Sequence, residues 1–318
     1  MRLRKNHILI LFILSVVAIA GCVGQRQTTV APNDGLVITE FSDDNDKVDE
    51  GENVAFTLGV ENQGGTDASN VIAELVGIEQ TWRDIDGELL LDTQSKDLKN
   101  MLRPDPQFNI PGDLKTAIWR LKTPSLPQLT QPFTVKAKVT YDYNTTGAIT
   151  IKAASKTFIR AKYAGDSTQI QNPMTITNTN APVKISLTDK IPPIIFDDTD
   201  TGDNEQDFVV QFILKNVGSG FPITDSVPGK VLGNIKLLGP FEFRDCLGAQ
   251  NTNEVELNED NVDFAKLKIS SGEVKISCVV TISKDTWGAR QEETATILFD
   301  LVYRYWIDKE VIVTVFGK

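Results

Sequence analysis

The sequence holds a single histidine, His7, near its start. A chain processed after this segment has none. Without histidine, Ser-His-Asp and Cys-His catalysis are excluded, and the commonest ligand for transition metals is missing. There is also no glycine-rich phosphate loop, no CxxC pair and no nucleophile elbow. We therefore expect a protein that is not an enzyme and needs no cofactor.

Basic residues are also few. The chain has 32 Lys and Arg against 43 Asp and Glu, a formal net charge of −11. Removing residues 1–21 takes away Arg2, Arg4 and Lys5, which lowers the charge from −11 to −14. Phosphate backbones and anionic lipid headgroups repel such a surface. We expect no nucleic-acid partner and no peripheral electrostatic contact with a membrane.

Only one long apolar run occurs, "ILILFILSVVAIA" at 8–20, and it follows a basic start. Thirteen helical residues rise about 20 Å, short of the hydrocarbon core of about 30 Å. This pattern predicts a secretory signal peptide, residues 1–21. The sequence Ile19-Ala20-Gly21-Cys22 resembles the lipobox of prokaryotic lipoproteins, which implies a lipid-modified Cys22 as first mature residue. An ordinary signal or short anchor with an incidental cysteine is the alternative.

The polar segment that follows, 22–35, predicts a flexible tether. One acyl chain binds a membrane only marginally, so we expect two or more chains on Cys22. The expected location is the outer face of the cytoplasmic membrane or the cell surface, with the membrane as a partner through the lipid. The two remaining cysteines, Cys246 and Cys278, suggest a disulfide in an exported protein. Two buried thiols are the alternative.

Two similar blocks make up the rest of the chain. "VAFTLGVEN" (54–62) and "FVVQFILKN" (208–216) alternate with period two, and each lies between an acidic loop and a glycine-rich turn. Downstream, the pairs Tyr141/Tyr143 and Tyr303/Tyr305 are each expected to precede a short turn and another strand. This predicts an all-β fold of two tandem Ig-like antiparallel sandwiches, 36–160 and 182–318, joined by a linker at 161–181. A helical turn is expected at Ser95–Leu102.

The segment Val48–Gly77 resembles the first half of a CARDB-type domain, an Ig-like module of prokaryotic surface proteins. Gly51, Asn62, Gly64 and the run Ser69-Asn70-Val71 carry the resemblance. The second block keeps Asn216 and Gly218 only. The resemblance implies a sandwich used for display, spacing or adhesion, and it brings no catalytic residues.

The sequence contains one candidate metal site and one further candidate modification site. The acidic loop offers Asp198, Asp200, Asp203 and Glu205, whose oxygens suit calcium, although the spacing departs from an EF-hand. A solvated turn is the alternative. Asn144-Thr145-Thr146 is a glycosylation sequon in an expected hairpin turn, which makes Asn144 a candidate glycosylation site. The alternative is that the triplet occurs by chance.

The aromatic residues favour packing over binding. Each Tyr-x-Tyr pair shares one strand face, which is typical of a core with hydroxyls bonded to the backbone. The four tryptophans, Trp82, Trp119, Trp287 and Trp306, are widely spaced core candidates, with sugar stacking as the alternative.

These observations predict a membrane-anchored surface lipoprotein that acts as a non-catalytic binding, adhesion or spacer module toward a surface protein or glycan. The first alternative is an accessory subunit of an envelope or filament assembly. The second is a carbohydrate-active hydrolase with paired carboxylates and no histidine.

Overall fold

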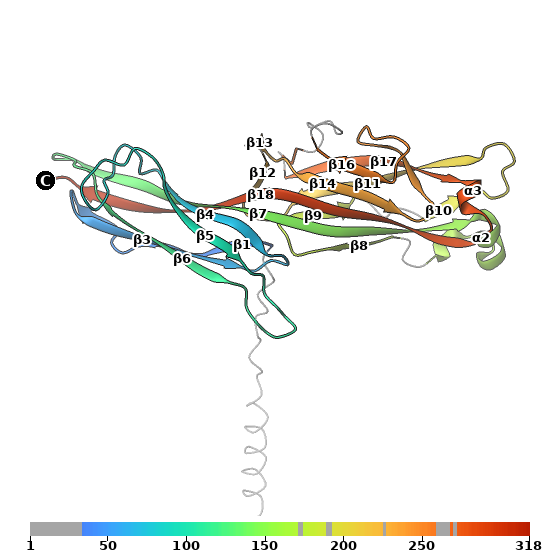
Figure 1. Ribbon diagram of the computed structural model, residues 1–318, viewed down its shortest axis with the longest axis horizontal. Coiled ribbons are helices and arrows are strands. Elements are labelled where there is room, and N and C mark those ends of the chain that lie inside the picture. The colour runs from blue at the N-terminus through green and yellow to red at the C-terminus, as the bar shows by residue number, and fades with distance from the viewer. Residues whose placement is uncertain (1–33, 171–173, 189–192, 225–226, 259–267, 270–271) are drawn as a thin grey trace, which may run out of the picture. The chain divides into compact units, whose positions relative to one another are not determined.

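The chain folds almost entirely into β-strands (Figure 1). The computed structural model describes residues 34–170, 174–188, 193–224, 227–258, 268–269 and 272–318. The prediction of an all-β, mainly antiparallel fold is confirmed. The signal segment 1–21 and Cys22 lie outside the described residues. Within them, no helix has the length and apolar character needed to cross a bilayer.

The strands, in chain order, are β1 (Leu36–Asp43), β2 (Lys47–Asp49), β3 (Asn53–Asn62), β4 (Ala68–Val76), β5 (Gln94–Met101), β6 (Leu114–Lys122), β7 (Thr130–Ser155), β8 (Met174–Asn178), β9 (Val183–Leu187), β10 (Ile194–Phe196), β11 (Glu205–Asn216), β12 (Phe221–Thr224), β13 (Val227–Pro228), β14 (Leu232–Leu238), β15 (Glu242–Cys246), β16 (Glu254–Leu257), β17 (Glu273–Ser283) and β18 (Glu292–Phe316). Short helices are α2 (Lys156–Tyr163), η1 (Ser167–Gln169) and α3 (Lys284–Trp287).

Two very long strands, β7 and β18, organise the fold. They pair antiparallel along all 25 residues of β18, from Glu292 opposite Ala154 to Phe316 opposite Thr130. At about 3.4 Å per residue, this β7–β18 ribbon is roughly 80 Å long. Side chains alternate along it, so that one face is buried in the core and the other is outward. Figure 1 shows both strands passing from one group of strands into the other.

Each half of the ribbon carries its own set of strands. Lobe 1 comprises β1–β6 with residues 130–142 of β7 and 304–316 of β18. Here β4 pairs with β7, and a second sheet of order β1-β3-β6 supplies the opposing layer. The alternating sequence of β3 points Val54, Phe56, Leu58 and Val60 into the interior.

Lobe 2 comprises β8–β17 with the remaining halves of the ribbon. Its outer strands are β8 on β7 and β14 on β18, and β12 joins β18 at the boundary with lobe 1. The second layer is a four-stranded sheet of order β15-β17-β11-β9. Each lobe is therefore a two-layered β-sandwich, as the repeated pattern predicted.

The lobes share strands, however, instead of following one another as separate units. Strands from 36–160 and from 182–318 are hydrogen-bonded to each other along the whole ribbon. The segment 161–181, predicted as a linker, contains η1 and adds β8 to the sheet. One continuous cluster of buried side chains extends through both lobes, and residues 32–318 form one compact unit.

Two local predictions were wrong. Residues Ser95–Leu102, expected to form a helical turn, fall almost wholly in β5. The three-residue spacing of the buried Leu98 and Met101 comes from a β-bulge, where Lys99 adopts a φ of +62° and the register with β4 shifts. The turn expected after each Tyr-x-Tyr pair is also missing, because β7 and β18 hydrogen-bond through these positions without interruption.

Candidate functional site

Four buried tyrosines mark the boundary between the lobes, which we call the waist. Tyr143 lies opposite Tyr303, and Tyr141 lies opposite Tyr305 in the ribbon register. All four are at most 3% exposed, and ring centroids of neighbours lie 5.6 to 6.2 Å apart. Burial raises the pKa of each hydroxyl, that of Tyr305 to about 12, so the rings stay neutral.

The tyrosine hydroxyls connect both lobes to the ribbon. Backbone N–H groups of Leu36 and Val183, at the starts of β1 and β9, donate to Tyr141 and Tyr303 at 3.2 and 3.3 Å. The N–H groups of Thr66 and Gly220 donate to Tyr143 and Tyr305 at 3.2 and 3.0 Å. The same bond pattern thus occurs twice, and the role expected for these tyrosines from sequence, core packing with backbone bonds, agrees with the structure.

The two repeated asparagines close the turns beside this cluster. Asn62 is fully buried, donates to the carbonyls of Thr66 and Met101, and accepts from the Gly64 N–H. Asn216 donates to the Gly220 carbonyl and accepts from the Tyr305 hydroxyl. These bonds fix the waist from inside, and so they position the outward face of the ribbon above it.

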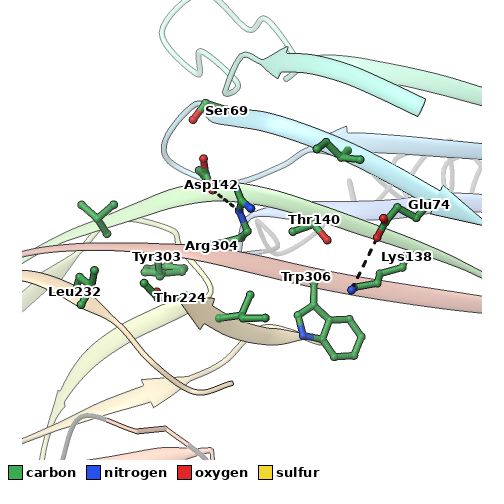
Figure 2. A pocket seen from close by; sticks show the side chains of 13 residues that line it. Ser69, Glu74, Lys138, Thr140, Asp142, Thr224, Leu232, Tyr303, Arg304 and Trp306 are labelled. Atoms are coloured by element: carbon green, nitrogen blue, oxygen red, sulfur yellow. Dashed lines mark hydrogen bonds and ion pairs between the residues drawn. The ribbon is translucent and has the colours of Figure 1, made fainter. Parts of the chain in front are cut away.

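A groove of about 780 Å³ lies on that outward face at the waist (Figure 2). Its floor is formed by the ribbon, and its sides come from β4 in lobe 1 and from β12 and the start of β14 in lobe 2. The lining residues are Ser69, Ile72, Glu74, Lys138, Thr140, Asp142, Ile223, Thr224, Leu232, Val302, Tyr303, Arg304 and Trp306.

An ion pair occupies the centre of the groove floor. Arg304 Nε donates to Asp142 Oδ1 at 2.8 Å, and the Asn70 side-chain amide donates to Asp142 Oδ2 at 2.7 Å. Partial burial raises the pKa of Asp142, but the bonds from Arg304 and Asn70 outweigh it, so that the pKa lies below its ordinary value. The hydrogen bond to Asp142 raises the pKa of Arg304. Both groups therefore stay charged at neutral pH.

An aromatic surface lies beside this pair. Trp306 is half-buried, its ring lies 5.6 Å from that of Phe221, and Lys138 Nζ lies 5.6 Å from the indole centroid. Figure 2 shows Lys138 directed toward both Trp306 and Glu74, whose carboxylate is 3.9 Å from Nζ. Phe221, Val302 and Ile72 are 46%, 51% and 37% exposed, so the groove offers apolar contact area next to paired charges.

The groove combines charged groups that are held ionised with apolar contact area. The carboxylate with a shifted pKa, Asp142, is held ionised, which is unsuited to a general acid. The part of the chain that the structure describes contains no histidine, so it places none beside the hydroxyls of Ser69, Thr140 and Thr224. An indole face, aliphatic side chains and charged groups already in position are the features of a recognition surface.

Sequence reasoning missed the groove residues, although a signal for two of them was present. Asp142 and Arg304 are the central residues of the two Tyr-x-Tyr pairs. Period-two alternation places them on the face opposite the tyrosines, and their opposite charges indicate pairing.

The predicted disulfide is confirmed. Cys246 and Cys278 lie opposite each other in β15 and β17, with an S–S bond of 2.00 Å and a Cα–Cα distance of 4.4 Å. Both are fully buried. Such a bond is typical of proteins that work outside the reducing cytosol.

The predicted calcium ligands do not come together. The Asp198 carboxylate accepts from the Thr157 N–H at the start of α2, and Asp200 accepts from the Gly202 N–H. Glu205 forms an ion pair with Arg244 at 2.8 Å, and Asp203 is exposed. Among the described residues, no three His, Cys, Asp or Glu side chains are grouped so that they could hold a metal ion. The calcium site stays a prediction without a ligand geometry.

The glycosylation candidate Asn144 lies inside β7, opposite Val302, and is partly buried; the hairpin turn expected there does not occur. Its modification stays a prediction. Of the tryptophans, Trp82, Trp119 and Trp287 are core residues, at most 3% exposed. Trp306 alone among the four reaches the groove.

No protein-family model and no curated protein matches the chain, so the CARDB resemblance stays a prediction. Solved structures are similar to it at low scores, among them the following three. The C-terminal globular domain of an oligosaccharyltransferase from Pyrococcus abyssi has a TM-score of 0.24 and 8% identity, covering 90% of this chain and 50% of that one. The Enterococcus faecalis adhesin ACE has a TM-score of 0.16 and 9% identity, covering 88% and 95%. The collagen adhesin CNA from S. aureus has a TM-score of 0.11 and 10% identity, covering 88% and 92%. These are adhesin-type and other β-rich domains, and at such scores the likeness assigns no function.

Proposed function

We propose that this protein is a non-catalytic binding module displayed outside the cell, tethered to the membrane by a lipid on Cys22. The waist groove is its contact surface. The observation that carries this proposal is the aromatic and ionic surface around Trp306, held on a ribbon that both lobes fix in place. The disulfide supports an oxidising location, and the lipobox-like sequence supports the anchor.

The ribbon gives the groove a defined geometry before a ligand arrives. Its two strands are paired on both sides at the waist, by β4 and by β12, and the tyrosine cluster holds them from below. Binding to such a surface orders few additional groups, and this limits the entropic cost of association. The role of the two lobes is thus to hold a small recognition surface rigidly.

The full-length, processed protein should be screened on glycan and peptide arrays. Any ligand found is then titrated against Trp306→Ala, with Phe316→Ala as control, since Phe316 is an exposed aromatic at the far end of the same strand. Loss of a central aromatic contact costs about 2 kcal/mol or more, or roughly 30-fold in affinity. We expect that loss for Trp306→Ala and none for Phe316→Ala.

Two results would reject the proposal. Turnover of an array ligand would make the protein a hydrolase, and equal effects of both variants would place binding elsewhere. The anchor is tested separately by Cys22→Ser, which should abolish fatty-acid labelling and release the protein into the medium.

A further inference from the structure

The loop between β5 and β6 carries an unusual apolar tip. Phe108 is 74% exposed, the highest value among the large hydrophobic side chains of the described residues, and Ile110 is 56% exposed. Leu102 and Leu114, at the base of the loop, are 58% and 64% exposed. Figure 1 shows this loop projecting away from the rest of lobe 1. Monomeric proteins seldom expose a large contiguous group of apolar side chains to water unless it contacts another protein, a ligand or a membrane.

This tip is ordered by its own bonds. Asp105 and Ile110 exchange two backbone hydrogen bonds at 2.9 and 3.0 Å, and the Asp113 N–H donates to the Leu102 carbonyl at 3.0 Å. The Asp105 carboxylate accepts from the Gln107 N–H. Three prolines, Pro104, Pro106 and Pro111, restrict the backbone further. The loop is therefore a stiff hairpin that presents Phe108 at little entropic cost.

The hairpin leaves lobe 1 beside the point where the tether enters it. The Asn62 N–H, at the end of β3, donates to the Asp113 carbonyl at 3.0 Å. The next residue, Gln63, donates its N–H to the Gly35 carbonyl at 3.0 Å. A Cβ on Gly64 would lie 2.7 Å from the Gly35 nitrogen, which shows how closely the chain start packs here. The end of β3 thus holds both the base of the hairpin and the first described residues.

The length of the hairpin can be compared with the length of the tether that leads to the membrane. Residues 23–34 separate Cys22 from Gly35. The flexible tether that the sequence predicts for this segment would have a root-mean-square span of about 20 Å. The five residue steps from Asp113 to Phe108 cover about 17 Å in an extended hairpin. The two lengths match, so a hairpin directed toward the membrane brings its tip to the bilayer surface when the tether has its average span.

We propose that the β5–β6 hairpin is a second membrane contact, with Phe108 and Ile110 inserted into the boundary between headgroups and acyl chains. The inference rests on the proposed lipid anchor at Cys22. The acidic surface of the protein makes no electrostatic attachment, so the apolar tip provides the contact. A tether alone leaves the lobes free to rotate, whereas a tether plus a rigid hairpin sets the orientation of lobe 1 on the membrane.

A fluorescent label reports this contact directly. Cys22 is taken to be lipidated and Cys246 is bonded to Cys278, so Phe108→Cys adds the one reactive thiol for an environment-sensitive dye. The lipidated full-length protein is reconstituted into phosphatidylcholine vesicles with or without brominated acyl chains. Val209→Cys is the matched control, because Val209 is 59% exposed on β11 in lobe 2. Both sites are exposed, so neither substitution disturbs the core.

We expect the label at residue 108 to shift to the blue and to lose about half its emission or more with brominated lipid, while the label at 209 stays unchanged. Vesicle flotation measures the anchor independently. If the protein floats but the labels at 108 and 209 are equally unquenched, the hairpin contact is overturned and the lipid anchor is not. If the protein fails to float, the lipid anchor is overturned. A label at 108 that is shielded on whole cells but unquenched by brominated lipid would assign the tip to a protein partner, and this also overturns the proposal.

Discussion

The shared ribbon predicts that the two lobes unfold together, and replacing Phe56 by Ala tests this. Phe56 lies in β3 of lobe 1, is fully buried, and packs with its ring centroid 5.6 Å from that of Trp82 and 6.3 Å from that of Phe41. Truncating a buried phenylalanine to alanine costs about 3–5 kcal/mol, so we take about 4 kcal/mol.

The size of the unfolding unit sets the shift in Tm. Unfolding entropy is about 2.1 cal/mol/K per residue, which gives about 0.6 kcal/mol/K for a unit of roughly 290 residues. A loss of about 4 kcal/mol then lowers a single Tm by about 7 °C. A separate domain of roughly 125 residues would instead fall by about 15 °C, while the other domain kept its Tm.

Calorimetry gives the number of transitions, and hydrogen exchange on peptides from β17 reports lobe 2 alone. We expect one transition and a loss of protection in β17 equal to that in β3. Ile118→Ala is the control, because Ile118 lies in the same sheet but is 48% exposed, and it should change stability by less than about 0.5 kcal/mol. Two transitions, with β17 unaffected by Phe56→Ala, would refute the cooperative ribbon.

Three further predictions concern the waist and the disulfide. Tyr303→Phe should cost about 1–3 kcal/mol in urea titrations, because the buried Val183 N–H loses its acceptor; an unchanged midpoint would contradict this. Replacing Cys246 and Cys278 together by Ser should cost about 3–4 kcal/mol, since the bond spans a sequence separation of 32. A wild-type Tm that is insensitive to reductant would count against that role. Stability should hold up to about pH 10 and fall toward about pH 12, because burial raises the pKa of Tyr305 to about 12 while the unfolded side chain titrates near 10, so that unfolding releases a proton in this range. Denaturation midpoints followed together with phenolate absorbance check this in a Tyr163→Phe background, which leaves only the four buried tyrosines. Phenolate appearing at pH 10 in that variant without unfolding would disprove it.

Individual strands were predictable because each has one buried face. The alternating segment 54–62 is β3 with one residue added, and the alternating segment 208–216 forms the second part of β11. The repeated tyrosine pairs also indicated the core at the waist correctly. In each case the signal is local, since neighbouring side chains of a strand point to opposite faces.

The turn expected after Tyr143 shows how a local signal misleads. Asn144, Thr145, Thr146 and Gly147 are typical turn residues. In the structure Gly147 is required for close packing, since a Cβ there would lie 2.8 Å from the Ile185 side chain and 3.0 Å from the Thr177 carbonyl. A glycine inside a strand can mark close approach of a neighbour, and the sequence alone does not distinguish this from a turn.

The pairing of β7 with β18 could not be predicted from local sequence patterns either. The repeat showed two similar blocks, and the simplest arrangement keeps the strands of each block together. Nothing in the alternation of Phe133–Ser155 states which strand lies beside it, because every strand of that pattern presents the same backbone groups. The groove was missed for the same reason, since its floor is formed by residues more than 150 positions apart, such as Asp142 and Arg304.

The charges at the waist favour the pairing of these two similar strands with each other. Asp142 and Arg304 hold equivalent places between their tyrosines and lie directly opposite in the ribbon. If two copies of β7 from different molecules paired in this register, Asp142 would face Asp142, and two copies of β18 would place Arg304 against Arg304. Like charges directly opposite each other destabilise a sheet. The same ion pair that forms the groove floor thus favours the intramolecular ribbon, so the proposed binding surface and the strand pairing have one contact in common.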